Sequence, residues 1–208
     1  FIVFLAGGMG TGKSHSVKYA NKKGYFDVQR YVHVDPDMIK SMLPEMGGYI
    51  RCNRKTAGTL THRESGYIAE IATQAALRQC KNVVVDGSLR NWRWYTKVFS
   101  ELHHKRSHYR ISIIKVWCER ETMYKRAAAR GITTGREVPK ALLDESYDQV
   151  AESVDRLRHF CEHVIEINTE GPEPIVSAIS SNGVPQAIEG TGWEQFQQVW
   201  RRKAGEVC

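Results

Sequence analysis

The chain opens with a short apolar run that leads directly into a glycine-rich segment. Residues 1–5 read FIVFL, and residues 7–14 read GGMGTGKS. The second segment fits the pattern G-x-x-x-x-G-K-[ST], with Gly7 and Gly12 as its fixed glycines. Glycines let the backbone turn tightly and aim successive N–H groups at an anion, and the helix that follows adds its positive end. Pattern and flanks together predict a strand, a phosphate-binding loop and a helix.

The side chains of this segment indicate a nucleoside triphosphate as the ligand. Lys13 carries a mobile positive charge for the β- and γ-phosphates, and the hydroxyl of Ser14 can coordinate Mg²⁺. The residues expected to bind the nucleotide are Gly7, Gly8, Gly10, Thr11, Gly12, Lys13 and Ser14.

Length and composition set wider limits. A chain of 208 residues with 41% hydrophobic and 25% charged residues is typical of one soluble domain, with room for an appendage. The net charge of +7 suits a protein that handles phosphates, and it would also suit a nucleic-acid binder. No apolar run approaches the roughly 18 residues of a membrane span. Five scattered cysteines without a C-x-x-C pair predict reduced thiols, no zinc site and a cytoplasmic location. Because the sequence begins inside the first predicted strand, we expect that its true N-terminus is missing.

Strand and helix patterns alternate along most of the chain. We expect strands at residues 1–5, 30–34, 82–85, 109–118 and 164–167, and helices at 13–23, 38–43, 62–79, 91–104, 119–130 and 139–162. Unbroken apolar strands are typical of parallel sheets that are buried on both faces. The sequence thus predicts an α/β fold of the P-loop NTPase or kinase type, with three layers and a mostly parallel five-stranded sheet. Residues 45–61 show no clear period, and we expect a surface loop with a functional role.

The composition changes near the end of the chain. We therefore predict a kinase-like domain at residues 1–168 and an extension at 169–208. Frequent Gly, Pro and Ser predict a loop, in which residues 175–179 could form a turn of helix. An apolar stripe at helical spacing follows, formed by Trp193, Phe196, Val199 and Trp200. This amphipathic helix either packs on its own domain or docks a partner protein.

Carboxylates follow two of the predicted strands. Asp86 ends the apolar run NVVV, where an aspartate can hold Mg²⁺ across from Ser14, or cap the turn that follows. Asp35 and Asp37 follow the second strand, and ligands of open α/β sheets bind at the carboxyl ends of strands. A carboxylate there can accept the proton of an attacking hydroxyl, although the DPD segment could also only initiate a helix.

Basic and aromatic residues cluster further along. Guanidinium groups on a mobile lid could neutralise a migrating phosphoryl group, and the candidates are Arg120, Arg126, Arg130 and Arg136. Arg136 follows Gly135 in a predicted loop, which suits lid motion, whereas helical arginines often form a solvated face. Trp92 and Trp94 could stack on a base or pack in a helix.

Four segments resemble the zeta toxins and related P-loop kinases. They are GGMGTGKS, VDPDMIKSMLPE, SGYIAEIATQAALRQCKNVVVDGSLRN and ERETMYKRAAARGITTGREVPK, within residues 1–167. Bacterial zeta toxins use ATP and Mg²⁺ to phosphorylate the 3′-hydroxyl of the sugar in UDP-N-acetylglucosamine. The resemblance implies the same kind of reaction here.

The resemblance also implies roles for individual residues. Asp37 corresponds to the catalytic base, and Arg120 and Arg136 correspond to the two lid arginines that clamp the phosphates. Residues implied to contact the substrate are Glu70, Asp86 and Ser88, to which we add Arg90 of the same segment. Asp86 and Ser88 stand where the toxins have Glu and Thr. The longer spacing between the two arginines leaves Arg130 as an alternative for either role.

Three functional hypotheses follow from the sequence. The leading one is an ATP-dependent kinase for a hydroxyl of a small molecule, with Asp37 as base and Lys13, Arg120 and Arg136 acting on the phosphates. The second is a polynucleotide 5′-hydroxyl kinase, suggested by the positive charge and by basic aromatic runs such as LRNWRWY. The third is a nucleotide-binding interaction module whose C-terminal helix docks a partner.

Overall fold

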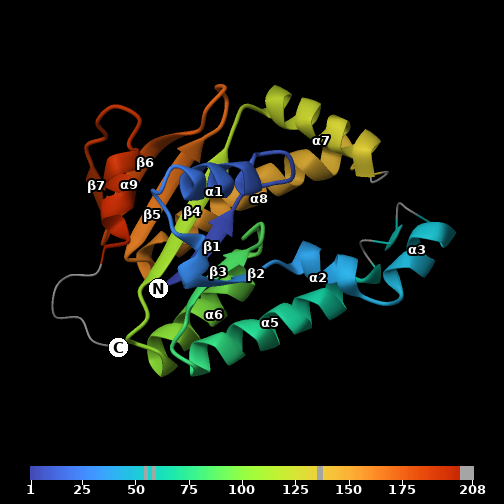
Figure 1. The fold of residues 1–208 in the computed structure, drawn as a ribbon, viewed down its shortest axis with the longest axis horizontal. Helices are drawn as coiled ribbons and strands as arrows, with labels where there is room; N and C mark the ends of the chain where they lie inside the picture. Colours follow the sequence, from blue (N-terminus) through green and yellow to red (C-terminus); the bar gives the residue numbers. More distant parts are fainter. Residues whose placement is uncertain (54–55, 58–59, 135–137, 202–208) are drawn as a thin grey trace.

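A seven-stranded sheet forms the centre of the part of the chain that the structure describes (Figure 1). The computed structural model describes residues 1–53, 56–57, 60–134 and 138–201. The strands lie in the order β2-β3-β1-β4-β5-β6-β7.

The five strands expected from the sequence form the parallel part of this sheet. They are β1 (Ile2–Ala6), β2 (Tyr31–Val34), β3 (Asn82–Asp86), β4 (Ile111–Trp117) and β5 (His163–Asn168). All neighbouring pairs among them are parallel, which confirms the predicted α/β fold. Since parallel strands end at the same edge of a sheet, the segments that follow β1, β2 and β3 meet there.

Two antiparallel strands correct the predicted number of five. They are β6 (Ile175–Ser181), which pairs with β5, and β7 (Val184–Gln186), which pairs with β6. Residues 175–179 are therefore strand and not a turn of helix. The register shifts between Glu166 and Ile167, so the buried residues of β6 are Val176 and Ile179. Their spacing of three imitates a helical pattern and conceals the strand.

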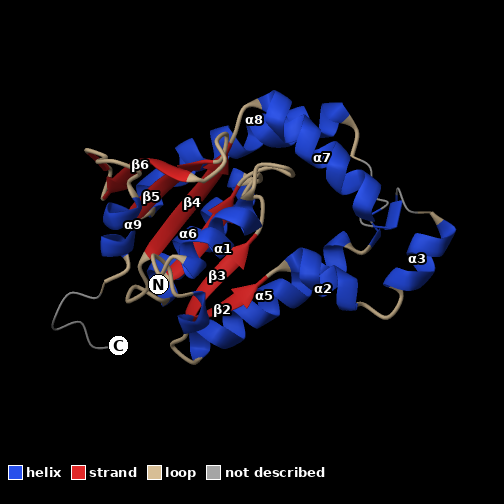
Figure 2. Ribbon diagram, turned by 45° about the horizontal axis from the view of Figure 1, so that its top comes forward, coloured by secondary structure: helices blue, strands red, loops and turns tan. Residues whose placement is uncertain are grey.

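Helices cover both faces of the sheet (Figure 2). One face carries Ile2 and Phe4 and packs against α5 (His62–Arg78), α6 (Trp92–Lys105) and α8 (Lys140–Leu157). The other face carries Val3 and Leu5 and packs against α1 (Lys13–Lys22) and α9 (Trp193–Val199). Burial on both faces explains why the central strands β1 and β3 lack an alternating polar pattern. Two short 3₁₀ helices are η1 (Val28–Arg30), before β2, and η2 (Arg158–Phe160), after α8.

Three helices stand at the carboxyl edge of the sheet. Figure 2 shows α7 (Arg120–Thr134) on one side and α2 (Pro36–Met42) with α3 (Met46–Cys52) on the other. The sequence predicts a loop at residues 45–61, but residues 46–52 form α3. Two adjacent glycines, at 47 and 48, weaken the period that would have marked this helix. Helix α7 also continues through Gly131, which is buried, instead of ending at Arg130.

The apolar stripe of α9 packs on its own domain. Trp193 and Phe196 are each 1% exposed and belong to the core on the α1 side of the sheet. The Trp193 ring stacks on Tyr25 with 5.4 Å between centroids, and its Nε1 donates a hydrogen bond to the carbonyl of Pro174. This stripe is therefore not a free docking surface for a partner protein, which corrects that alternative.

None of the helices in the described ranges is both long enough and apolar enough to span a bilayer.

Replacing Trp193 with alanine should lower the free energy of unfolding by about 3–5 kcal/mol, because a large buried side chain is lost. Urea denaturation followed by circular dichroism measures this change. Trp94→Ala is the matched control, since Trp94 is 38% exposed on α6, and it should cost less than about 1 kcal/mol. A loss below about 1 kcal/mol for Trp193→Ala would show that α9 is not part of the cooperative fold.

Candidate active site

The glycine-rich loop after β1 has a conformation that two of its glycines make possible. Gly12 has φ 90° and immediately precedes α1, and Gly10 has φ 86°. A Cβ on Gly10 would lie 2.6 Å from the carbonyl oxygen of Met123 in α7. Both the backbone angle and the close approach of α7 therefore require glycine at position 10.

Hydrogen bonds hold this loop against its neighbours. The amide of Gly7 donates to the carbonyl of Ser88 at 3.2 Å, and Thr11 Oγ1 donates to the carbonyl of Gly8 at 2.9 Å. The carbonyl of Thr11 accepts from Thr169 Oγ1 at 2.8 Å. The loop is thus fixed to the turn after β3 at one end and to the segment after β5 at the other.

Lys13 lies at the centre of the charged groups of the site. Its ammonium donates to the carbonyls of Gly7 at 2.7 Å and Gly8 at 3.2 Å. Burial lowers the pKa of Lys13, and the negative charges of Asp86 and Asp37, and more weakly Asp35, act against this shift. The structure therefore brings the three predicted carboxylates within electrostatic reach of the lysine.

Asp35 and Asp37 have different tasks in the segment after β2. Asp35 Oδ1 accepts from the amides of Asp37 at 2.8 Å and Met38 at 3.2 Å, so it caps α2. The helix consequently begins at Pro36, two residues earlier than the sequence predicts. The Asp37 side chain is 48% exposed, and its Oδ1 accepts from the buried Lys40 Nζ at 3.1 Å. The helix-initiating alternative thus describes Asp35, whereas the carboxylate of Asp37 remains accessible.

Asp86 lies at the end of β3, opposite Leu5 in the register with β1. Its side chain is 10% exposed, and Oδ2 is 3.4 Å from His33 Nε2. The hydrogen bond to Asp86 raises the pKa of His33.

Ser14 is exposed in the first turn of α1. In the described ranges no three His, Cys, Asp or Glu side chains converge to form a metal cage. One carboxylate and one hydroxyl nevertheless fit Mg²⁺, which in kinase sites binds one or two carboxylates together with phosphates and water.

The remaining predicted substrate residues lie around the turn after β3. Ser88 is half-buried and Arg90 is exposed. Glu70 is exposed on α5, and its charge acts on Tyr95. Burial, with a smaller contribution from Glu70, raises the pKa of Tyr95 to about 12. A Cβ on Gly87 would lie 3.3 Å from the Tyr95 hydroxyl, so Glu70 and Tyr95 belong to the same region as this turn.

The arginines of α7 face three different groups. Arg120 forms ion pairs with Asp144 at 2.8 Å and with Asp148, both in α8, and lies over the ring of Tyr147. Arg126 donates to Thr169. Arg130 is the arginine whose positive charge lowers the pKa of Lys13. Arg136 lies outside the described residues.

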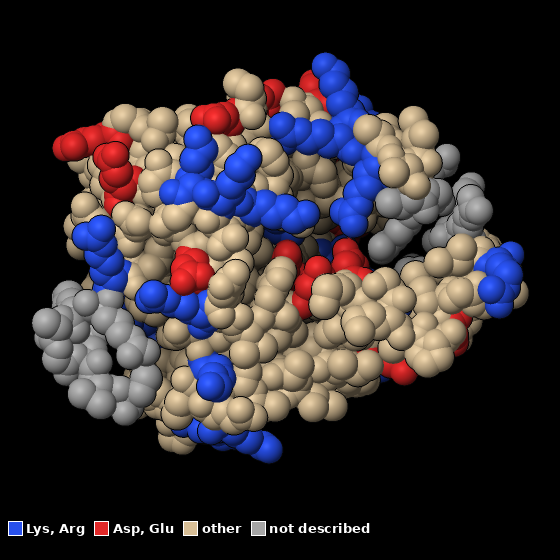
Figure 3. All heavy atoms as spheres, in the orientation of Figure 1, with Lys and Arg blue, Asp and Glu red and all other residues tan. Residues whose placement is uncertain are grey.

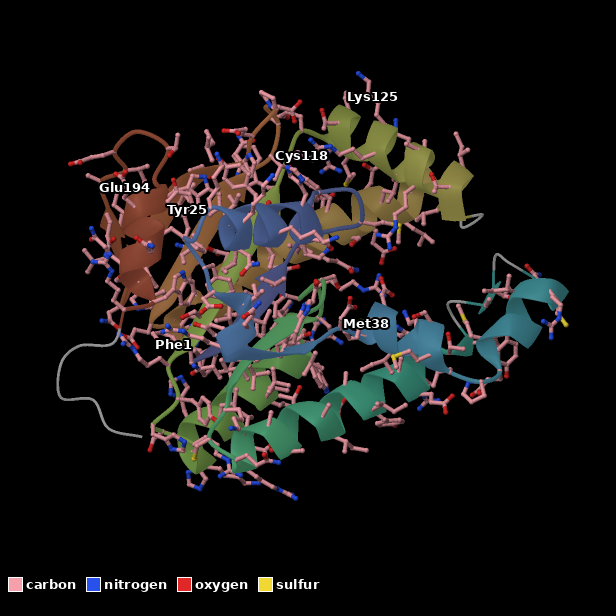
Figure 4. All side chains as sticks on the ribbon, viewed as in Figure 1. Phe1, Tyr25, Met38, Cys118, Lys125 and Glu194 are labelled. Atoms are coloured by element: carbon pink, nitrogen blue, oxygen red, sulfur yellow. The ribbon has the colours of Figure 1, made fainter. Side chains whose placement is uncertain are left out.

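Charge is divided across this edge of the molecule. Figure 3 shows Lys and Arg side chains over α1 and α7, and Asp and Glu side chains opposite them, where β3 and α2 meet. The surface is hollowed between the two groups (Figure 3). Figure 4 places Met38 on the α2 side, and Cys118 and Lys125 on the α7 side, with Lys125 pointing outward. The arrangement can hold an anion on one wall and present carboxylates from the other.

Sequence reasoning does not single out three residues that the structure places at the site. His33 alternates with two valines in a short strand, and no spacing rule marks it. Tyr95 is four residues after Asn91, the N-cap of α6, so it lies one turn into the helix and close to the β3 turn. Thr169 follows directly after β5, and its position at the carboxyl edge of the sheet is the signal that could have identified it.

The fold and the site define a class of protein: they are those of P-loop kinase-type phosphotransferases. The sequence model of the zeta toxin family matches residues 1–176. The chain therefore belongs to the zeta toxin family. No curated protein matches the sequence.

Solved structures agree with this assignment at the level of the fold. A chain of the PezAT chromosomal toxin–antitoxin system of Streptococcus pneumoniae has 16% identity and a TM-score of 0.68, covering 96% of this chain and 83% of that one. A chain of the complex AvrRxo1-ORF1:-ORF2 with ATP has 16% identity and a TM-score of 0.61, covering 99% and 65%. A chain of the Pnkp1/Rnl/Hen1 RNA repair complex has 19% identity and a TM-score of 0.54, covering 91% and 52%.

Gly10→Ala should destabilise the protein by about 2 kcal/mol or more and weaken ATP binding, because it combines a strained φ with a backbone clash. Thermal unfolding and titration calorimetry measure the two effects. Gly48→Ala is the control, since a Cβ there meets no atom within 4 Å. In the interior of α3 this change should stabilise by about 0.5–1 kcal/mol. Tolerance of Ala at position 10 would contradict the loop geometry.

Proposed function

We propose that the protein transfers the γ-phosphoryl group of ATP to a hydroxyl of a small molecule, with a nucleotide sugar such as UDP-N-acetylglucosamine as acceptor. The observation that carries this proposal is the group of carboxylates around Lys13, the lysine of the phosphate-binding loop. Asp86, Asp37 and Asp35 all act on the charge of Lys13, and Asp37 is accessible. A nucleotide held by the loop would therefore face an acidic group with room for an alcohol. Membership of the zeta toxin family supports the same reaction.

Binding of ATP rests on the loop and on Lys13. Amides of residues 8–14 would surround the phosphates, and the Lys13 ammonium, which the loop carbonyls orient, would neutralise part of their charge. Ser14 and Asp86 would hold Mg²⁺, and the ion would neutralise a further part of the phosphate charge.

Asp37 is our choice for the base that acts on the acceptor hydroxyl. Its carboxylate is bonded to Lys40 Nζ, which fixes its direction, while nearly half of the side chain stays open to a ligand. Asp35 cannot serve in the same way, because one of its oxygens caps α2. Glu70, Ser88 and Arg90 border the acceptor side and would contact the substrate.

Arg130 is our choice among the described arginines for the charge that develops on the phosphoryl group. It lies in electrostatic reach of Lys13, whereas Arg120 is held by two carboxylates of α8. Arg136, which the family resemblance assigns to the lid, remains a prediction from the sequence.

A polynucleotide 5′-hydroxyl kinase is the second candidate, and one surface favours it. Helix α6 begins beside the β3 turn, and it carries exposed basic and aromatic residues, namely Arg93, Trp94 and Lys97, next to Arg90. Trp92 instead packs between the guanidinium groups of Arg93 and Arg156. Phosphorylation of a single-stranded oligonucleotide, weakened steeply by salt, would favour this candidate over a small-molecule acceptor.

A protein partner also remains part of the proposal. Two of the similar structures belong to a toxin–antitoxin system and to an ORF1:ORF2 complex. The interaction module hypothesis, however, relied on the apolar stripe of α9, and the buried stripe offers no such surface. These observations fit an enzyme that binds a partner protein through another surface better than a nucleotide-binding module that phosphorylates no acceptor.

Asp37→Asn should lower phosphoryl transfer to UDP-N-acetylglucosamine about 10²- to 10⁴-fold, because it removes the base while keeping the shape. Phosphorus NMR of the sugar nucleotide measures the transfer, and calorimetry should show ATP affinity changed by less than about threefold. Asp155→Asn is the control, since Asp155 is an exposed carboxylate of α8 paired with Arg158. Unchanged transfer by Asp37→Asn would show that Asp37 is not the base. If the native chain transfers no phosphoryl group to UDP-N-acetylglucosamine, this nucleotide sugar is not the acceptor.

Asp86→Asn should raise the Mg²⁺ concentration needed for half-maximal ATP turnover about tenfold, because a neutral amide binds the ion less well than a carboxylate. A titration of activity with MgCl₂ measures it, and chelation with EDTA should abolish turnover of the native chain. His33→Gln removes the imidazole next to Asp86 but leaves the negative charge of Asp86 in place. The Mg²⁺ requirement of this variant should therefore stay within about twofold of the native value. An unaltered requirement in Asp86→Asn would contradict the metal assignment.

A further inference from the structure

Thr169 connects the segment after β5 to the end of the phosphate-binding loop. The residue is 2% exposed, and its Oγ1 lies 2.8 Å from the carbonyl oxygen of Thr11 and 3.3 Å from that of Trp117. A Cβ on Gly12 would lie 3.2 Å from both Cγ2 and Oγ1 of Thr169. The Thr169 side chain therefore packs directly against the loop at the point where α1 begins.

Arg126 of α7 holds Thr169 at two atoms. Its Nη1 donates to Thr169 Oγ1 at 2.9 Å, and its Nη2 donates to the Thr169 carbonyl at 2.7 Å. A hydroxyl has one hydrogen and two lone pairs, so Thr169 can accept from Arg126 and donate to Thr11 at the same time. A continuous chain of hydrogen bonds thus runs from α7 through Thr169 to the loop.

The next residue attaches the start of α7 to the same segment. Glu170 Oε2 accepts from the amide of Glu119 at 2.9 Å, and its Oε1 accepts from Thr122 Oγ1 at 2.5 Å. Because these contacts fix the first turn of α7, the guanidinium of Arg126 projects from a helix that is itself anchored.

A cavity borders the loop next to β4 and α8. Its volume is about 260 Å³, and it is lined by Gly7, Gly8 and Thr11 of the loop and by residues such as Lys115 of β4 and Tyr147 of α8. The hydrogen bond from Thr169 is one of the restraints on the Thr11–Gly12 turn, together with the bond that the Gly12 carbonyl accepts from the Ser16 amide at 2.9 Å.

We propose that Arg126 and Thr169 are positioning residues of the phosphate-binding loop. Arg126 acts through Thr169, fixes the last turn of the loop relative to α7, and so sets the affinity of the loop for phosphate. It differs in this from Arg130, one helical turn further on, whose positive charge acts on Lys13. The effect on ATP affinity rests on the proposed function, but the effect on the loop itself does not.

Hydrogen exchange in the protein without nucleotide tests the restraint directly. Thr169→Val removes the hydroxyl at nearly constant shape, and Thr169→Ser keeps it. Amides of residues 7–16 should exchange about 3- to 10-fold faster in Thr169→Val and in Arg126→Met, and at nearly the native rate in Thr169→Ser. Peptides from β4 (residues 111–117) should be unchanged, which separates loop release from general destabilisation. Native exchange of the loop in Thr169→Val would overturn the proposal.

Titration calorimetry with ATP tests the route of action. Thr169→Val and Arg126→Met should each weaken binding about 3- to 10-fold, and together they should weaken it by less than the product of the two factors. A direct phosphate contact of Arg126 predicts the full product instead, and that result would overturn its positioning role. If the native chain does not bind ATP, the proposed function fails, while the exchange experiment still decides the inference.

Discussion

The parallel pairing of β1 with β3 is the constraint on which the site depends. Backbone register sets Leu5 opposite Asp86, and the first amide of the glycine-rich loop then bonds to Ser88 in the turn after β3. Strand β2 lies on the other side of β3, which brings Asp35 and Asp37 to the same edge. The carboxylates thus reach Lys13 because of the ladder of main-chain hydrogen bonds. Side-chain chemistry decides what they do there, but the order of the strands decides that they meet.

Electrostatics gives the two walls of the site different chemistry. Burial works against the positive charge of Lys13, and the nearby carboxylates favour it. Lys and Arg side chains gather over α1 and α7, and acidic side chains gather where β3 meets α2 (Figure 3). In the proposed reaction the first wall would stabilise a phosphate chain, and a carboxylate of the second wall would accept the proton of a hydroxyl. Phosphoryl transfer requires mostly such positioning and charge neutralisation, which this division provides.

Sequence reasoning succeeds where a local pattern carries the information. The glycine-rich loop, the five parallel strands and the aspartates at strand ends are of this kind. It fails at β6, where a register shift gives buried residues a helical spacing, and at α3, where two glycines hide the period. The arginines are an intermediate case. Arg126 and Arg130 are four residues apart and share a helix face, whereas Arg120, six residues before Arg126, points elsewhere. The spacing holds this information, but only the packing of α7 shows which face lies over the loop.

The burial of Trp193 has a consequence for how the family relates to the folded unit. The match to the family ends at residue 176, inside strand β6. The core on the α1 side, however, continues through Trp193 and Phe196 to Val199. A chain cut at the end of the family match would uncover the edge of β5 and the rings of Tyr19, Tyr25 and Phe26, which α9 covers. The core therefore extends beyond the end of the family match, and the boundaries of truncated fragments should follow the tertiary contacts.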